Sequence, residues 1–257
     1  NDRALRSVTV MQDEKKGTPR HDSFVITVAS EMMAIMCLAK DPDDFRERVN
    51  NIIVAYTFDD KPVYLRQLRI SNAIMKLMRE ALKPNLVQTE ENNPTLVHGG
   101  PFANIAHGCN SVIALKLALK LGDVVVTEAG FGADLGAEKF LDICCPTAGK
   151  KPDGVVMVAT IRALKEHGGV AIENLKEPNV EALKVGIANL QLHLENIQKY
   201  GLPVVVAINH FAEDSKEEIE VLTKWCEEHG YTVSFVDGFL KGGDNRRSEE
   251  RFSRTET

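Results

Sequence analysis

Residue types that bind anions or move protons are densest in one loop, His98-Gly-Gly-Pro-Phe-Ala-Asn-Ile-Ala-His-Gly-Cys-Asn-Ser111. The apolar run before it, at 94–97, and the amphipathic run after it, at 112–121, predict a strand, a glycine-rich loop and a helix. Open α/β sheets bind ligands in such loops, beyond the carboxyl ends of their strands and near helix N-termini. We therefore take His98 and His107 as candidate catalytic residues, with a structural role as the alternative for each.

A second glycine-rich loop spans 127–140, and the apolar run Val124–Val126 before it predicts another strand core. Glu128 and Asp134 are candidate catalytic carboxylates and Mg²⁺ ligands, because nucleotide-dependent enzymes often hold this ion through such side chains. The alternative is capping, since Asp134 precedes a predicted helix at 135–141 whose N-terminus favours an acidic residue.

Four positions in these two loops are candidates for nucleotide or loop contacts. Gly99 and Gly100 let the backbone approach a ligand closely or adopt positive φ angles, with a plain tight turn as the alternative. Phe131 is a candidate because the glycines on either side of it, including Gly132, would expose an aromatic ring that could stack on a flat heterocycle. Burial of Phe131 as a loop anchor is the alternative.

Three further apolar runs, at 155–159, 203–208 and 231–236, predict strands that also end in polar or aromatic residues. The residues that follow them are Thr160 and Arg162, then Asn209, His210 and Phe211, then Asp237 and Phe239. Together with His98 and Glu128, they mark five predicted strand ends, which is typical of a ligand cleft along one rim of a sheet. Arg162 and Lys165 could attract phosphate, with a solvated helix start as the alternative.

Strand and helix patterns alternate along the chain. The continuous apolar strands are typical of a parallel sheet covered on both faces. Helical spacing, caps and glycine or proline stops predict helices at 31–38, 41–50, 65–82, 179–200 and 216–229. The alternation predicts an α/β fold with a doubly wound, mostly parallel sheet.

Composition argues against several classes of partner. The 257 residues carry a net charge of −6 and contain no basic stretch, so no nucleic-acid partner is expected. No apolar run approaches the roughly 18–20 residues of a membrane span, so no membrane partner is expected. The five cysteines have no metal-site spacing, and reduced structural thiols are expected.

Ordered blocks along the chain resemble the formate–tetrahydrofolate ligase family, from Asn1 to Gly243. Besides the two loops, the blocks are Asn1-Asp-Arg-Ala-Leu-Arg6, Ile26-Thr-Val-Ala-Ser-Glu31, Lys83-Pro-Asn-Leu-Val-Gln-Thr89, Val158-Ala-Thr-Ile-Arg-Ala-Leu-Lys165 and Lys241-Gly-Gly243. The resemblance implies a phosphate-loop-NTPase-like fold and the ATP-dependent conversion of formate to formyl phosphate, followed by formyl transfer to tetrahydrofolate. It also implies ATP with Mg²⁺, a monovalent cation, a homo-oligomer and a cytoplasmic location.

The resemblance also assigns roles to candidate residues. A family histidine contacts formyl phosphate, and His98, at a predicted strand end, is the expected one. The family sandwiches the pteridine ring of tetrahydrofolate between two aromatic side chains, which here are Phe211 and Phe239, with Asn209 as a further expected contact. Phe239 stands where the family usually has tryptophan, and weaker folate binding is expected because phenylalanine offers less area and no indole donor. A role in the core is the alternative for both rings.

The family's phosphate-binding loop has no counterpart in this sequence, because no G-x-x-x-x-G-K-[ST] pattern occurs. We therefore expect a partial ligase catalytic region at 1–243 and a disordered tail at 244–257, where apolar residues are almost absent. Two functions stay open. One is ATP-dependent ligation by a partial copy of the enzyme, and the other is an inactive fragment acting as a folate-binding or oligomerisation module.

Overall fold

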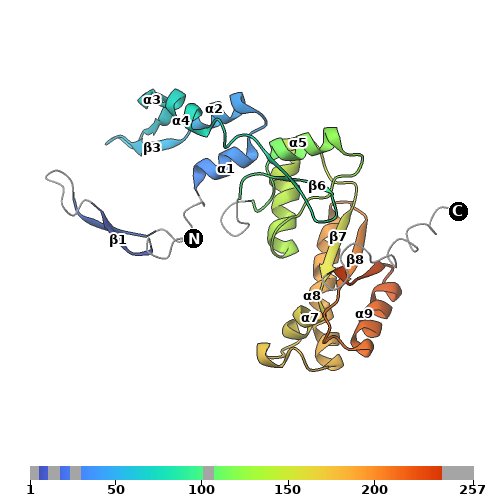
Figure 1. Cartoon of the computed structure of the whole chain (residues 1–257). Coiled ribbons are helices and arrows are strands. Elements are labelled where there is room, and N and C mark those ends of the chain that lie inside the picture. The colour runs from blue at the N-terminus through green and yellow to red at the C-terminus, as the bar shows by residue number, and fades with distance from the viewer. Residues whose placement is uncertain (1–5, 11–17, 24–29, 101–106, 239–257) are drawn as a thin grey trace. The chain divides into compact units, whose positions relative to one another are not determined.

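The computed structural model describes residues 6–10, 18–23, 30–100 and 107–238. The chain falls into two compact units, Asn1–Lys151 and Pro152–Thr257, called here unit 1 and unit 2 (Figure 1). The strand expected at 24–29, the ring of Phe239 and the tail expected at 244–257 lie outside the described residues. Within the described ranges, no helix is both long and apolar enough to span a bilayer.

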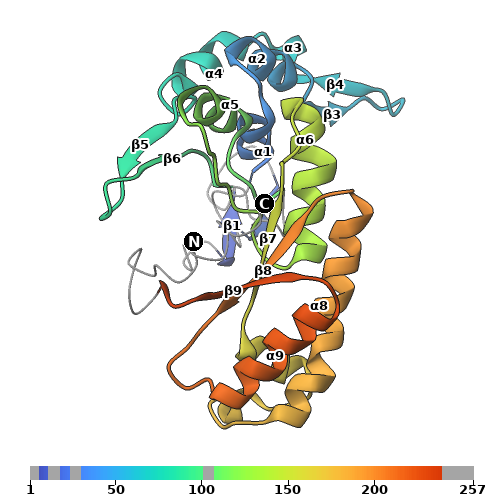
Figure 2. The same ribbon diagram turned by 90° about the vertical axis from the view of Figure 1, so that its right-hand side faces the viewer.

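Unit 2 is built on a three-stranded parallel sheet in the order β7-β8-β9 (Figure 2). Its strands are β7 (Val155–Ala159), β8 (Val204–Asn209) and β9 (Thr232–Val236). Ala159 pairs with Ile208 and Asn209 pairs with Val236, so the carboxyl ends of all three strands lie at one edge. The α/β class and the three strands predicted for this part of the chain are confirmed.

Helices connect these strands, and each of the longer ones begins at a side-chain cap. The helices are α7 (Ile161–His167), the short 3-10 turn η4 (Ile172–Asn174), α8 (Val180–Lys199) and α9 (Lys216–Glu228). Thr160, Asn179 and Ser215 each accept a hydrogen bond from the backbone N–H three residues ahead, which satisfies a donor that the helix leaves unpaired. The helices predicted at 179–200 and 216–229 are confirmed.

The core of unit 2 forms where these helices meet alternating strand residues. Ala159, Val206, Ile208 and Val233 belong to one buried cluster with apolar side chains of α7, α8 and α9. Strand residues of opposite parity point the other way, and Val156 and Val158 of β7 stay 65% and 62% exposed.

Helices α7 and α8 approach so closely that two glycines are required between them. A Cβ atom at Gly186 would lie 1.7 Å from the carbonyl oxygen of Leu164, and one at Gly168 would lie 1.9 Å from that of Ala182. This close approach fixes α7, the helix that directly follows β7, against the long α8.

Unit 1 has a different sheet organisation. Its described strands form three separate antiparallel pairs. The pairs are β1 (Val8–Val10) with β2 (Arg20–Asp22), β3 (Ile53–Tyr56) with β4 (Pro62–Tyr64), and β5 (Asn85–Gln88) with β6 (Pro94–Val97). The strand predicted at 94–97 is confirmed as β6, but it lies in a hairpin. The parallel sheet is therefore shown for β7, β8 and β9, and a doubly wound sheet across the whole chain stays a prediction.

The helices of unit 1 include three that the sequence predicts closely, namely α1 (Glu31–Leu38), α2 (Pro42–Asn50) and α5 (Val112–Leu121). Further elements are α3 (Leu65–Leu68), α4 (Ser71–Met78), the π-helical turns η2 (Ala133–Ala137) and η3 (Phe140–Cys144), and α6 (Cys145–Ala148). Phe45 and Val49 of α2 pack with Met36 and Leu65 in a second buried cluster. The helix predicted at 65–82 is broken, because Arg69 takes a left-handed φ of 58° between α3 and α4.

One predicted strand is wrong. Residues 124–126 form no strand, and Val124 and Val126 are 84% and 91% exposed. A short apolar run predicts a strand only if a neighbouring backbone satisfies its N–H and C=O groups, and the sequence does not show that neighbour. The helix predicted at 135–141 is confirmed as helical, but most of it has π-helical geometry, in η2 and η3, with α-helical residues 138–139 between them.

Candidate functional site

In unit 1, the two glycine-rich loops singled out by the sequence lie against each other. The backbone N–H of Gly130 donates to the carbonyl oxygen of Gly108 at 3.1 Å, and Cys109 forms an isolated antiparallel bridge with Ala129. A Cβ atom at Gly136 would lie 1.7 Å from the carbonyl oxygen of Gly130, so η2 reaches this loop only because it carries a glycine there. The histidine loop (107–110) and the acidic loop (128–134) therefore form one local structure.

His98 is held by hydrogen bonds at both ring nitrogens. Its Nδ1 lies 2.6 Å from Ser111 Oγ, and its Nε2 lies 2.7 Å from the carbonyl oxygen of Ala81. Ser111 also accepts from the backbone N–H of Ala114, because it caps α5. The buried imidazole of His98 therefore connects the end of β6 to the loop after α4 and to the start of α5. Because both ring nitrogens are hydrogen-bonded, these contacts favour the structural alternative for His98.

His107 has the opposite environment. It is 2% exposed, and its Nε2 has no hydrogen-bond partner among the described residues. Burial lowers the pKa of His107 below 6.5, and the nearby positive charge of Lys139 lowers this pKa further, so the imidazole is neutral at pH 7. A buried polar atom without a partner is unusual in a folded protein, so His107 stays a candidate for a polar contact.

The acidic loop presents its side chains to solvent. Glu128 and Asp134 are exposed, and Phe131 is 66% exposed with a left-handed φ of 69°. That φ is rare for a bulky residue, and such backbone strain is concentrated at functional sites. A Cβ atom at Gly132 would lie 2.5 Å from Asp134 Oδ1, so a side chain at 132 would displace this carboxylate. The exposure expected for Phe131 is confirmed.

The structure separates the roles of the other two candidate glycines. Gly99 adopts a φ of 74°, a region that favours glycine, so the expected positive φ is confirmed there. A Cβ atom at Gly100 would meet no atom within 4 Å, so sterics do not require glycine at that position.

The metal assignment of Glu128 and Asp134 stays a prediction. In the part of the chain that the structure describes, no three His, Cys, Asp or Glu side chains converge as a metal site. Mg²⁺ at a nucleotide needs fewer protein ligands, because it commonly takes one or two carboxylates and completes its shell with phosphate and water.

The cysteines are free and buried, as the sequence predicts. Burial raises the pKa of Cys37, Cys145 and Cys226 to about 11, and a hydrogen bond with Cys109, followed by burial, raises the pKa of Cys144 as well. Thiols with raised pKa values stay protonated at neutral pH and are poor nucleophiles.

In unit 2, the carboxyl edge of the sheet gathers three of the five predicted strand ends. The backbone N–H of His210, which follows β8, donates to the carbonyl oxygen of Val236 at the end of β9. Nδ1 of His210 lies 3.6 Å from Oδ1 of the buried Asp237. Asn209 is the last residue of β8, and Phe211 follows two residues later. The other two predicted ends, at His98 and Glu128, belong to unit 1 and do not extend this sheet.

Phe211 lies in a short loop that is closed by Asp214. The backbone N–H of Phe211 donates to Asp214 Oδ2 at 2.8 Å, and the backbone N–H of Asp214 donates back to the carbonyl oxygen of Phe211 at 3.0 Å. The guanidinium carbon of Arg162 lies 4.2 Å from the centre of the Phe211 ring. The half-buried ring is therefore positioned by its backbone and by one cation from α7.

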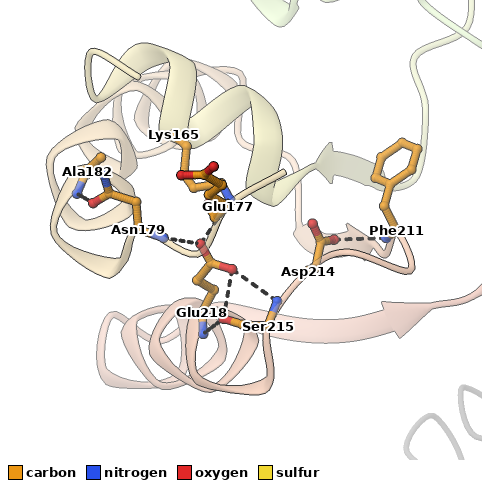
Figure 3. Close-up of polar contacts among 8 residues, drawn as sticks. All are labelled: Lys165, Glu177, Asn179, Ala182, Phe211, Asp214, Ser215 and Glu218. Atoms are coloured by element: carbon orange, nitrogen blue, oxygen red, sulfur yellow. Dashed lines mark hydrogen bonds and ion pairs between the residues drawn. The ribbon is translucent and has the colours of Figure 1, made fainter. Parts of the chain in front are cut away.

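A buried ion pair anchors the same loop to the helices (Figure 3). Lys165 Nζ lies 3.0 Å from Glu218 Oε1, and the two side chains are 1% and 0% exposed. Lys165 also donates to the carbonyl oxygen of Glu177 at 2.9 Å, while Glu218 accepts from the backbone N–H groups of Asn179 and Ser215. Burial opposes ionisation of Glu218, but these donors and Lys165 together lower its pKa.

This ion pair is a structural feature that the sequence does not predict. The expected solvated or phosphate-attracting role of Lys165 is wrong, because the ammonium is buried and paired within unit 2. The available signal was the Ser215-x-x-Glu218 capping box at the start of α9, which is formed in the structure. A capping box predicts a helix start, but it does not predict which lysine its carboxylate will meet.

Unit 2 is of the α/β class, with an aromatic ring and polar side chains just beyond the carboxyl edge of a parallel sheet, which is where open α/β sheets commonly bind ligands. The family model for formate–tetrahydrofolate ligase matches residues 1–248 of the 257-residue chain. The chain belongs to this family, whose members are ligases with formate, ATP and tetrahydrofolate as substrates.

Proposed function

We propose that this chain acts in the ATP-dependent ligation of formate to tetrahydrofolate, which gives 10-formyltetrahydrofolate through formyl phosphate. The observation that carries the proposal is the ring of Phe211, held half-buried beyond the carboxyl edge of a parallel sheet in a member of this family. Phe211 would stack on the pteridine ring, with Asn209 beside it as a polar contact and Phe239 as the second ring.

The imidazole of His107, in unit 1, would donate a hydrogen bond to formyl phosphate. In the reaction, a formate oxygen attacks the γ-phosphorus of ATP and displaces ADP, and the folate amine then attacks the formyl carbon, displaces phosphate and loses its proton. A neutral imidazole can donate from Nε2 to an oxygen of formyl phosphate, and the Nε2 of His107 is free for this while that of His98 is not. We therefore assign this contact to His107 in place of His98.

Glu128 and Asp134 are the chemically suited ligands for Mg²⁺, since both carboxylates are exposed in the acidic loop. When bound, this ion would neutralise developing charge on the transferring phosphate. The family's doubly wound phosphate-loop fold, its monovalent cation and its homo-oligomeric assembly belong to the same proposal.

A calorimetric titration with tetrahydrofolate tests the folate part of this proposal. Phe211→Ala should weaken binding at least about tenfold, because stacking on an aromatic ring contributes roughly 1 kcal/mol beyond the buried area. Phe58→Ala is the matched control, since Phe58 is fully exposed in unit 1. Binding that Phe211→Ala leaves unchanged would remove Phe211 from the site.

Chemically prepared formyl phosphate tests the transfer step without requiring ATP. The chain should form 10-formyltetrahydrofolate from formyl phosphate and tetrahydrofolate, and His107→Gln should slow this transfer by about 100-fold, as expected for loss of an oxyanion contact. His21→Gln, at an exposed position, should leave the rate unchanged. A rate that His107→Gln does not alter would return the assignment to His98.

One observation favours the alternative function of a folate-binding module. The 257 residues contain no G-x-x-x-x-G-K-[ST] pattern, which is the usual cradle for the phosphates of ATP. Folate binding together with formyl transfer from formyl phosphate would support the ligase, whereas folate binding without transfer would support the module.

A further inference from the structure

Arg162 lies over one face of the Phe211 ring, which is the ring proposed to stack on folate. Its guanidinium carbon lies 4.2 Å from the centre of the Phe211 ring, well within the roughly 6 Å at which a cation and an aromatic face attract. The two residues come from different elements, because Arg162 is in the first turn of α7 and Phe211 is in the loop after β8. One face of this ring is therefore covered by a cation from unit 2 itself.

The guanidinium is held in place by the loop that carries the ring. Arg162 Nη2 donates to Glu213 Oε2 at 2.5 Å, and Glu213 lies two residues after Phe211. Lys176 approaches the same carboxylate at 3.7 Å. The pKa of Glu213 is lowered, first by its own backbone N–H and then by Arg162 and Lys176, so the carboxylate is charged at neutral pH.

A second contact fixes α7 about one helical turn after Arg162. Lys165, three residues after Arg162, forms the buried ion pair with Glu218 of α9 (Figure 3). The two cations therefore leave the same face of α7 and meet the same segment, 213–218, at two points. These two attachments fix the position of the Arg162 guanidinium relative to the loop that carries Phe211.

The hydrogen bonds of Arg162 do not account for its position by themselves. Its Nε is buried and has no hydrogen-bond partner among the described residues. Leaving a buried donor unpaired is unfavourable, so a contact with the ring must contribute to holding the guanidinium over it.

We propose that Arg162 is a positioning residue for folate binding, which holds the Phe211 ring with one face covered and the other face open to the pteridine. The proposal rests on the folate site proposed for Phe211. A phenylalanine side chain that is already ordered loses less conformational freedom when its ligand stacks on it. The same contact keeps the covered face of the Phe211 ring against Arg162.

Three variants separate this role from a general effect of charge. Arg162→Ala should weaken tetrahydrofolate binding roughly three- to tenfold, the size expected for ordering one side chain. Arg162→Lys should also weaken binding, because an ammonium can pair with Glu213 but has no plane to lay on the ring. Lys176→Ala removes a cation from the same carboxylate without touching Phe211, and it should bind folate like the parent chain.

A spectroscopic signature distinguishes positioning from a loss of folding. The Nε–H proton of Arg162 should be shifted upfield by the ring current of Phe211 in the intact chain, and Phe211→Leu should abolish the shift. Calorimetric stoichiometry and the fluorescence of Trp225, which is the only tryptophan and lies in unit 2, report whether each variant is folded.

Each pattern of results decides between the proposals. Weaker folate binding by both Arg162 variants, with normal stoichiometry and normal binding by Lys176→Ala, supports the positioning role. If the parent chain binds folate, Phe211→Ala weakens binding and both Arg162 variants bind like the parent, the positioning role is overturned and the folate site stands. If the parent chain does not bind folate, or Phe211→Ala binds equally well, the folate site at Phe211 fails and the role of Arg162 falls with it.

Discussion

At the scale of single residues, the imidazole of His107 is the group whose surroundings depart most from those of a structural histidine. It is buried, its Nε2 has no hydrogen-bond partner in the described part of the chain, and the positive charge of Lys139 is near. Burial and a nearby cation both disfavour the imidazolium form, so they act in the same direction on its pKa.

We predict that His107 titrates below 6.5 and that Lys139→Gln raises its pKa, because burial would then act without the nearby cation. An NMR titration of the histidine ring carbons, assigned with His107→Gln, measures both values. The unfolded chain takes up this proton near pH 6.5 and the folded chain only at lower pH, so stability should fall as pH drops through that window. His107→Gln should remove this contribution, and a pKa of His107 above 6.5 would contradict the prediction.

Sequence reasoning at this scale finds candidate residues more readily than it ranks them. His98 and His107 have similar contexts in one loop, but Ser111 Oγ and the carbonyl oxygen of Ala81 satisfy the first and leave the second available. Those partners lie 13 and 17 residues from His98 along the chain, so only the folded structure brings them together. The contact of Arg162 with Phe211 is unpredictable for the same reason.

At the scale of elements, one buried carboxylate ties the last turn of α7 to the starts of α8 and α9. Glu218 pairs with Lys165 of α7, accepts from Asn179 at the cap of α8, and closes the capping box of α9 with Ser215. A fully satisfied pair of this kind is sensitive to the loss of one partner, because the remaining charge stays buried.

We predict that Glu218→Gln destabilises unit 2 by about 3–5 kcal/mol, since Lys165 would be left as an unpaired buried cation. Chemical denaturation followed by Trp225 fluorescence measures the change. The folded pKa of Glu218 is lowered from 4.5, so its stabilising contribution is present above pH 4.5 and is lost as pH falls through the folded pKa. Glu217→Gln, at an exposed neighbouring position, is the control and should change stability little. A loss below about 1 kcal/mol would show that the pair contributes no more than a surface ion pair.

We predict a second element-scale effect at the contact of α7 with α8. Gly186→Ala should destabilise unit 2 by about 3 kcal/mol, the upper end of overpacking costs, because its Cβ would overlap the backbone carbonyl of Leu164. Gly154→Ala is a matched control, since its Cβ would have no neighbour closer than 3.6 Å. The same Trp225 denaturation experiment compares the two, and equal stabilities would mean that α7 and α8 can separate without loss.

Many elements of both units follow from local patterns, and the three predicted strands of unit 2 are all formed. The strand β7 and the helices α8 and α9 begin and end within a residue of their predicted limits, because their apolar periodicity and caps agree with the tertiary packing. Val124–Val126 has a comparable apolar run but no paired neighbour, so it forms no strand. Pairing partners and the left-handed turn at Arg69 depend on distant or backbone-level features that residue types do not encode.

At the scale of the whole molecule, the described residues form two large buried apolar clusters, one in each compact unit. The cluster of unit 2 joins the strands β7, β8 and β9 to the helices α7, α8 and α9, and the cluster of unit 1 is centred on α1 and α2. A compact unit with its own core is expected to unfold as one cooperative body.

We therefore predict that unit 2, prepared as residues 152–257, folds by itself. Its Trp225 fluorescence should show one cooperative transition with the same midpoint as in the intact chain, because the tryptophan packs against the core of this unit. Far-ultraviolet circular dichroism of the intact chain reports helices of both units, so it should show an additional transition that the fluorescence does not. A fragment with no cooperative transition, or with a clearly lower midpoint, would mean that residues 1–151 supply part of the stability of unit 2. Retention of the Arg162 ring-current shift in the fragment would show that the position of Phe211 is set within unit 2 alone.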